Sequence, residues 1–249
     1  MPSAFAVILE DFEDELTAVG ALVSASADPN TARPKTRIAG ANAAVLLLAA
    51  TFEEFVREMA RAYARAIVEA CDSYEKLPHK LATVLWKRTM EALARLQLNP
   101  RKEIFSRESI FSDALTRFTV TYQFCRGDIS QDIYEDLIHN ENNMRPQEIN
   151  SLFNLSGLKN VCMVASDNDG LMELLNETEP TKANARLVDR MDEFYERRNQ
   201  IAHSIRAMRS SGPQEISGDI EMMRRFGQAL CLALEKQLEV APPLNKAGA

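Results

Sequence analysis

The chain contains little glycine, with nine residues in 249, and few runs of β-branched residues. Strands are rich in β-branched side chains, and glycine is the residue that tight turns between strands most often require. The shortage of both therefore favours an all-α protein over a sheet or a barrel. The apolar fraction of 46% and the charged fraction of 26% are typical of a globular domain with a sizeable core.

Cysteine is also scarce, and its spacing excludes several kinds of site. The four cysteines form no CxxC pair and no cluster with histidine, so neither a disulfide framework nor a zinc site is expected. We interpret them as reduced core residues of a cytosolic protein: Cys71, Cys125, Cys162 and Cys231. The N-terminus lacks a basic segment, so no signal peptide is expected. The longest uncharged run, 38–52, is too short to span a bilayer and predicts a buried helix, so no membrane partner is expected.

Positive charge is in deficit, because the formal net charge is −7. This balance argues against a broad basic surface for nucleic acid, although not against a local basic cleft. The chain has no Walker loop, no GxGxxG and no GxSxG, so no nucleotide cofactor and no serine hydrolase chemistry are predicted. Asp136 and His139 have a spacing used in metal-binding bundles, but no further ligands complete a set. We therefore expect no metal and no cofactor.

Helical periodicity, in contrast, runs through most of the chain. It predicts two long core helices and additional short ones. The expected helices are 3–26, 37–71, 75–98, 107–125, 130–138, 146–154, 156–164, 168–177, 181–208 and 217–238. Proline, glycine and asparagine separate them, but no linker is long enough to divide the chain. We therefore expect one domain over residues 1–240, followed by a disordered tail at 241–249.

The helix expected over 181–208 carries an anomaly. Arg198 lies near the middle of its apolar stripe, at a spacing where leucine would be ordinary. A guanidinium in that position needs a carboxylate, a ligand phosphate or a wet interface. Glu53, at the border of the buried face of 37–71, is the obvious internal partner. An internal ion pair and a functional role are equally open at this point. The stripe consists of Leu187, Met191, Phe194, Ile201, Ile205 and Met208.

The second half of the same helix is basic. Arg197, Arg198, Arg206 and Arg209 occur there without an acidic residue, which predicts a local patch of the kind that phosphate recognition requires. The alternative is that cations at a helix C-terminus complement the macrodipole. That alternative explains the exposed arginines, but it does not explain Arg198 in the apolar stripe.

His203 lies five residues after Arg198, about 140° further round the helix. An isolated histidine on an exposed helix face usually has no catalytic role. One ideal helix does not aim Arg198 and His203 at a single point. A second helix across a two-fold axis could supply the missing convergence.

The segment Arg198-Asn199-Gln200-Ile201-Ala202-His203 resembles the Arg-polar-x-x-x-His motif of HEPN-domain ribonucleases (higher eukaryotes and prokaryotes nucleotide-binding). The context RRNQIAHS is similar to the RN-x-IAH form of that group. The stretch LLLAATFEEFVREMA resembles the family's early helix, whose glutamate maps to Glu53. The stretch NNMRPQEINSLFNLSGL is similar to a branch found near restriction and toxin–antitoxin genes. The resemblance covers most of residues 40–238 and is weakest at 72–140.

This resemblance implies a helical bundle of HEPN type that dimerises, so that two motif helices share a cleft, and a metal-independent endoribonuclease activity. His203 would move a proton, Arg198 would stabilise the phosphate, and Asn199 would position the phosphate or hold His203. Glu53 would orient Arg198 from the early helix. The expected products carry a 2′,3′-cyclic phosphate and a 5′-hydroxyl. Further RNA contacts are expected from Arg197, Arg206 and Arg209.

The implied partners are RNA, a second copy of the chain and an antitoxin protein, in a cytoplasmic toxin or antiphage defence role. Some toxin members carry a tyrosine two residues after the histidine, which a partner nucleotidyltransferase modifies. Ile205 occupies that position here, so this route of regulation is not expected. The alternative function is a non-catalytic HEPN module that binds RNA or a partner protein. The overall acidity of the chain favours that alternative.

Overall fold

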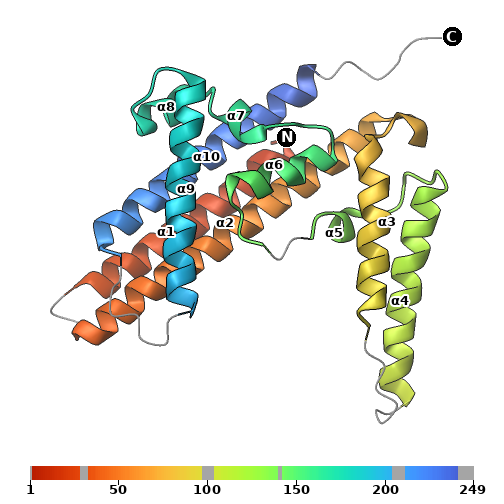
Figure 1. Cartoon of the computed structure of the whole chain (residues 1–249), viewed down its shortest axis with the longest axis horizontal. Helices are drawn as coiled ribbons and strands as arrows, with labels where there is room; N and C mark the ends of the chain where they lie inside the picture. The colour runs from red at the N-terminus through yellow and green to blue at the C-terminus, as the bar shows by residue number, and fades with distance from the viewer. Residues whose placement is uncertain (1, 29–32, 97–103, 140–141, 204–210, 241–249) are drawn as a thin grey trace.

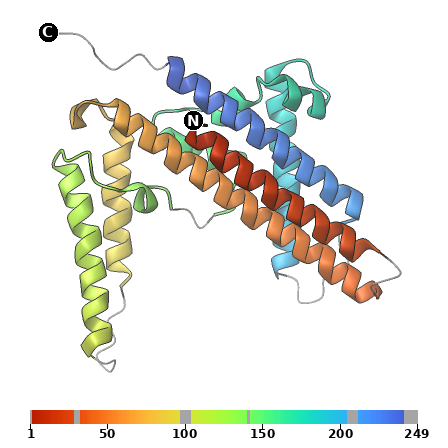
Figure 2. The ribbon, with the colours of Figure 1, turned by 180° about the vertical axis from the view of Figure 1, so that it is seen from behind.

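Three long helices form the framework of the computed structural model, which describes residues 2–28, 33–96, 104–139, 142–203 and 211–240. They are α1 (Ala4–Ala27), α2 (Pro34–Ala70) and α10 (Pro213–Val240). The hydroxyl of Ser3 accepts a hydrogen bond from the Ala6 N–H (3.1 Å) and so caps the start of α1. Seen from behind, the three helices run side by side (Figure 2).

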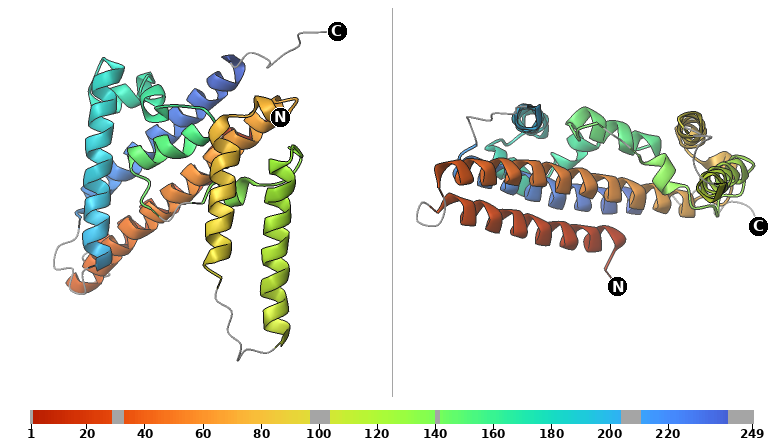
Figure 3. Two further views of the ribbon diagram at one scale, coloured as in Figure 1. Left: turned by 45° about the vertical axis from the view of Figure 1, so that its right-hand side comes forward. Right: turned by 90° about the horizontal axis from the view of Figure 1, so that it is seen from below.

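A second layer covers one face of α2 and α10 (Figure 3). It contains α6 (Pro146–Leu155), α7 (Val161–Ala165), α8 (Asp169–Leu175) and α9 (Pro180–His203). Helix α9 crosses the framework and packs against α2, α6, α7 and α8 (Figure 1). This crossing places the predicted motif directly above the helix that carries Glu53.

A helical hairpin extends from the far end of α2, away from α9 (Figures 1 and 3). It begins with a short 3₁₀ turn at Tyr74–Lys76 and contains α3 (His79–Ala94) and α4 (Ile104–Cys125). The one-turn helix α5 (Tyr134–Leu137) packs against α3 and α2. The principal neighbour of α4 is α3.

Aromatic rings fill the centre of the framework. Phe12 stacks on Phe55 with ring centroids 4.0 Å apart, and Phe52 lies 5.9 Å from Phe226. Gly227 permits this packing, because a Cβ at that position would lie 3.1 Å from the ring of Phe12 and 3.3 Å from that of Phe55. Close-packed rings of this kind hold α1, α2 and α10 at fixed separations.

The all-α fold is confirmed, since the described part of the chain contains helices and no strand. Helix α2 has a buried face, as predicted for 37–71, and Ile67 at the far end of the helix is half-buried against the core. The buried members are Val45, Leu48, Ala49, Phe52, Val56, Met59 and Tyr63. The four cysteines are free, and three of them are buried, as expected of core residues.

Several predicted helix limits are wrong, and glycine, asparagine or proline residues explain three of them. The helix predicted over 156–164 begins only at Val161, because Gly157 (φ 92°) and Asn160 (φ 53°) hold the backbone in the left-handed region. The last helix begins at Pro213 and not at 217, because proline fits the first position of a helix. Pro78 divides the helix predicted over 75–98, and 130–138 yields only α5.

Trp86, the only tryptophan of the chain, is not part of the buried side of α3. Leu81, Leu85 and Thr89 form the buried side of α3, whereas Trp86 is 40% exposed. The predicted end of the motif helix at 208 and the predicted tail at 241–249 lie outside the described residues.

Helix α2 is long and apolar enough to cross a membrane by length and composition. Half of its apolar window is buried inside the protein. Its apolar character is therefore explained by the contacts it makes with α1 and α10.

Candidate functional site

Helix α9 buries the first part of the predicted stripe. Leu187, Met191 and Phe194 are fully buried, and Ile201 is half-buried against the core. Ile205 and Met208 lie outside the described residues. Tyr195 is completely buried as well, which widens the buried face by one residue toward α2.

Arg198 is half-buried on this face and belongs to a small polar cluster. Its Nη1 donates to Oδ1 of Asn199 (3.3 Å), and Nδ2 of Asn143 donates to the same oxygen (3.0 Å). The Nε of Arg198 is buried and has no hydrogen-bond partner among the described residues. A buried donor without an acceptor is costly, so this guanidinium retains an unsatisfied demand for an anion or a polar ligand.

Glu53 lies beneath this cluster on α2. Burial raises the pKa of its carboxyl above the usual value, while the charges of Arg198 and Arg57 and the Met144 backbone N–H act in the opposite direction. Oε1 of Glu53 is enclosed and has no hydrogen-bond partner in the described part of the chain. In the part of the chain that the structure describes, no ion pair joins Glu53 to Arg198, and the two groups interact through the charge of Arg198, which acts to lower the pKa of the carboxyl.

Tyr195 was not identified from the sequence. Its buried hydroxyl has a pKa raised well above the usual value, first by burial and then by the nearby Glu53 carboxylate. Tyr195 precedes Arg198 by three residues, a spacing that places both side chains on neighbouring parts of the helix surface. This spacing could have identified Tyr195 from the sequence, because a tyrosine beside an apolar stripe can bring its hydroxyl into a buried polar cluster.

Replacement of Glu53 by glutamine tests its role in stability. A raised pKa means that the folded protein binds the Glu53 proton more tightly than the unfolded chain does. Ionisation of Glu53 therefore costs stability as the pH rises through the pKa values of this carboxyl in the unfolded and folded states. The difference in melting temperature, Glu53→Gln minus wild type, is expected to be more positive at pH 7 than at pH 4. Differential scanning calorimetry at both pH values measures this difference.

Glu54 provides the matched control, because Arg57 and Arg61 lower the pKa of its exposed carboxyl. Glu54→Gln should therefore show a small difference of the opposite sign. A sharp loss of stability in Glu53→Gln at pH 7 would instead mean that Glu53 neutralises Arg198 as a structural ion pair.

Arg197 points to α10 and is engaged there. Its Nη2 lies 2.7 Å from Oδ2 of Asp219 and its Nε lies 3.3 Å from Oε1 of Glu215. The side chain of Asp219 is only 9% exposed. These contacts favour a structural role for Arg197, although its predicted contact with RNA remains a prediction. The sequence predicts Arg197 as part of the basic patch on α9. Its two acidic partners lie on a different helix, so the local pattern does not reveal them.

Arg197→Ala is expected to destabilise the protein by about 2 kcal/mol, because it leaves the buried carboxylate of Asp219 without its cation. Urea unfolding followed by circular dichroism measures the loss. Arg197→Ala combined with Asp219→Asn should recover most of it, since the neutral amide no longer needs the charge. A loss below about 0.5 kcal/mol, within the range of an ordinary surface substitution, would contradict this assignment.

His203 is exposed and is the last described residue of α9. No described contact brings its imidazole to Arg198, in agreement with the angular separation along one helix. Asn199, in contrast, touches Arg198 directly. Arg206 and Arg209, the remaining predicted RNA contacts, lie outside the described residues.

A polar hollow of about 530 Å³ lies beside α9. Its lining includes Arg145, Asn150, Lys159 and Asp192. Arg145 is held by Asp192 (2.9 Å), whereas Lys159 is exposed. The lining of this hollow offers amide donors and the ammonium of Lys159.

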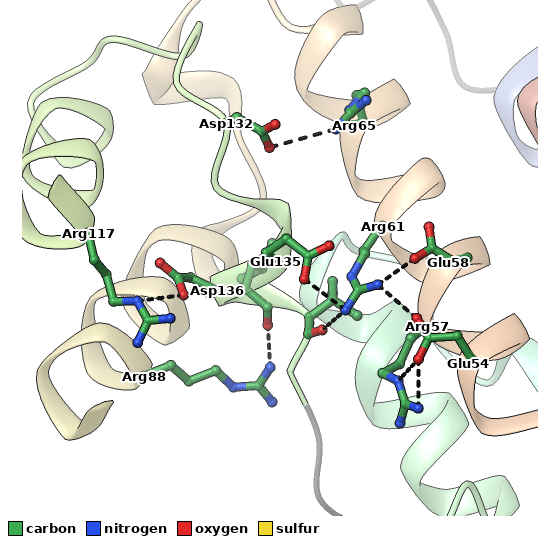
Figure 4. A network of polar contacts seen from close by, with 12 residues as sticks. Glu54, Arg57, Glu58, Arg61, Arg65, Arg88, Arg117, Asp132, Glu135 and Asp136 are labelled. Atoms are coloured by element: carbon green, nitrogen blue, oxygen red, sulfur yellow. Dashed lines mark hydrogen bonds and ion pairs between the residues drawn. The ribbon is translucent and has the colours of Figure 1, made fainter. Parts of the chain in front are cut away.

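The described residues contain no group of three or more histidine, cysteine or acidic side chains arranged to hold a metal ion. Asp136, which the sequence suggested as a metal ligand together with His139, forms an ion pair with Arg117 (3.0 Å; Figure 4). Arg57, the second cation near Glu53, is held by Glu54 at 2.8 Å in the same view.

Comparison with known proteins agrees with the motif and the fold. No curated protein and no solved structure matches the chain. The model of the RiboL-PSP-HEPN family matches residues 10–240, which includes Glu53 and the whole of α9. The resemblance inferred from the motif is thereby confirmed at the level of the family. With nearly the whole chain matched, the protein belongs to the RiboL-PSP-HEPN family of HEPN domains.

Proposed function

We propose that the protein is a metal-independent endoribonuclease. Membership of a HEPN family indicates either a ribonuclease or an RNA-binding module. One observation favours cleavage: the half-buried Arg198 keeps an unsatisfied Nε beside Asn199, five residues before an exposed histidine. A phosphate group would satisfy this donor and would place its own charge against the guanidinium.

The chemistry follows from these three side chains. Neutral His203 accepts the proton of a ribose 2′-hydroxyl, and the oxygen attacks the adjacent phosphorus. The bond from phosphorus to the 5′-oxygen breaks, and the leaving oxygen takes up a proton from the protonated imidazole or from water. Arg198 stabilises the charge on the phosphate oxygens as the bonds exchange, and Asn199 positions the phosphate. The products carry a 2′,3′-cyclic phosphate and a 5′-hydroxyl.

The active form in this proposal is a homodimer with a composite site. Arg198 and His203 diverge by about 140° on one α9, so a second α9 across a two-fold axis supplies the complementary group. Glu53 orients Arg198 from below. We place this activity in the cytoplasm, in a toxin or antiphage defence role with an antitoxin as the restraining partner.

The decisive experiment incubates the purified protein with tRNA and with single-stranded RNA, in the presence and absence of EDTA. Fragments with 2′,3′-cyclic phosphate and 5′-hydroxyl ends, formed equally well with EDTA, support the proposal. Cleavage that EDTA stops, or fragments with 5′-phosphate ends, would overturn the metal-free mechanism.

The second candidate is a non-catalytic module that binds RNA or a partner protein. The neutralisation of neighbouring cations favours it, because Arg197 pairs with Asp219 and Arg145 pairs with Asp192. Under this alternative the purified protein degrades no RNA at any ionic strength, yet binds it with an affinity that falls as salt rises.

A further inference from the structure

Helix α4 carries large apolar side chains on a face that no described element covers. Phe111 is 56% exposed, Leu115 is 65% exposed and Tyr122 is 42% exposed, while Phe118 is half-buried. At about 100° per residue, these four positions lie within about 60° of one another around the helix. We refer to Phe111, Leu115, Phe118 and Tyr122 as the α4 stripe.

The stripe is separate from the side of α4 that packs inside the protein. Thr121 and Phe124 are fully buried, and the Thr121 hydroxyl lies 2.8 Å from that of Thr89 on α3. Helix α4 therefore packs against α3 mainly through a side that is different from the α4 stripe. Trp86 of α3 adds to the exposed surface, because its ring lies 6.2 Å from that of Phe118. A contiguous exposed surface of this kind is typical of an interaction site.

The hairpin that carries the stripe is anchored to the framework by polar contacts (Figure 4). Arg61 of α2 pairs with Glu135 (3.2 Å), and Arg88 of α3 donates to the carbonyl oxygen of Leu137. Arg117 of α4 pairs with Asp136 in the same segment. These contacts connect α2, α3 and α4 through one short stretch of chain, so the stripe is held in a defined orientation.

Charge at the two ends of the stripe indicates what covers it. Glu108 and Arg126 are both exposed, and neither has an oppositely charged partner among the described residues. Each lies about 50° from the centre of the stripe, on the same side of the helix axis. Glu108 precedes Phe111 by three residues and Arg126 follows Tyr122 by four, so the two charges are placed almost symmetrically about the midpoint.

We propose that the α4 stripe is a two-fold interface with a second copy of this chain, in which the two α4 helices pack antiparallel. This arrangement sets Glu108 opposite Arg126 of the partner subunit, and Phe111 opposite Tyr122 of the partner subunit. Leu115 then packs against the partner subunit's Phe118 at the centre. The same surface serves both copies, as a two-fold axis requires.

This interface does not depend on the proposed nuclease activity, because it uses a different element from α9. The hairpin lies at the opposite end of the molecule from α9 (Figure 1). If both two-fold contacts form, the closed assembly is a tetramer, and loss of the α4 contact leaves a dimer. If only the α4 contact forms, its loss leaves a monomer.

Charge reversal tests the proposal without disturbing the core. Glu108→Arg and Arg126→Glu each place like charges opposite one another, so each variant alone should show half the wild-type mass by sedimentation equilibrium. An equimolar mixture of the two variants should recover the wild-type mass, because both charge pairs are restored in the mixed assembly. Leu115→Glu should halve the mass and should not be rescued by either variant.

Asp113→Arg is the matched control, since Asp113 is exposed on the opposite side of α4 and its reversal should leave the mass unchanged. Unchanged mass in both single reversals, or a mixture that stays at half mass, overturns the proposal. If the wild-type mass is recovered only after another protein is added, the surface binds a different partner. That result overturns the proposal as well. His203→Ala should retain the α4 contact, so failure of the nuclease proposal is seen separately.

Discussion

Replacement of His203 by alanine is expected to lower the rate of RNA cleavage by about 10²–10⁴-fold, the usual contribution of a positioned general acid or base. In the proposed mechanism the imidazole is the group that accepts the proton of the attacking 2′-hydroxyl. Single-turnover cleavage of a labelled RNA measures the effect. Any growth arrest caused by expression of the wild-type protein should disappear in the same variant.

Exposure of His203 makes this result interpretable, because the substitution removes no packing and should leave the melting temperature unchanged. Gln200→Ala is the matched control. Gln200 is also exposed on α9, where its side chain donates a hydrogen bond to Glu196 (3.4 Å), so cleavage should continue at the wild-type rate. Cleavage that survives in His203→Ala would remove the catalytic assignment of this residue.

The second large effect is expected for Arg198→Lys, with a loss of cleavage of about 10²–10³-fold. Lysine keeps the positive charge but lacks the planar set of donors that can hold two phosphate oxygens at once. The loss should appear mainly in kcat, because the geometry of the contact matters most when charge moves onto the phosphate. Steady-state kinetics with a short single-stranded RNA separates kcat from KM.

Arg197→Lys is the control for this experiment, since it makes the same substitution one residue away. The guanidinium of Arg197 contacts Asp219 and Glu215 on α10, so its replacement should leave kcat unaffected. If Arg198→Lys instead lowers the melting temperature and leaves cleavage intact, Arg198 is a structural residue held by its electrostatic contact with Glu53. Equal losses of cleavage in both variants would indicate a general requirement for guanidinium groups on this helix, and would remove the specific assignment of Arg198.

The motif helix illustrates what could be predicted from local sequence. The 3.6-residue period identified Leu187, Met191 and Phe194 as buried, and the same period exposed Arg198 as an anomaly. The burial of Tyr195 could not be predicted in this way, since the period alone leaves the width of a buried stripe open. It depends on α2 and on the chain around Met144, which lie far from α9 in the sequence.

The role of Arg197 shows a second limit. Arg197 and Arg198 are adjacent and chemically identical, and no local pattern separates a structural cation from a free one. Asp219 and Glu215 make the difference, because α10 brings their carboxylates to one arginine and not to the other. The hairpin shows the same limit, since the burial of Leu85 and the exposure of Trp86 depend on how α3 meets α4 and α5.

The sequence by itself determined the helical class, the family motif and the position of the charged residue within an apolar face. These features depend on backbone period and on residues close together in the chain. The tertiary structure decided which arginine is paired, that the Glu53 carboxylate is partly desolvated, and that the α4 stripe is left uncovered. Burial and ion pairing are properties of surfaces that meet across the fold, and the helices that form these surfaces are distant in sequence.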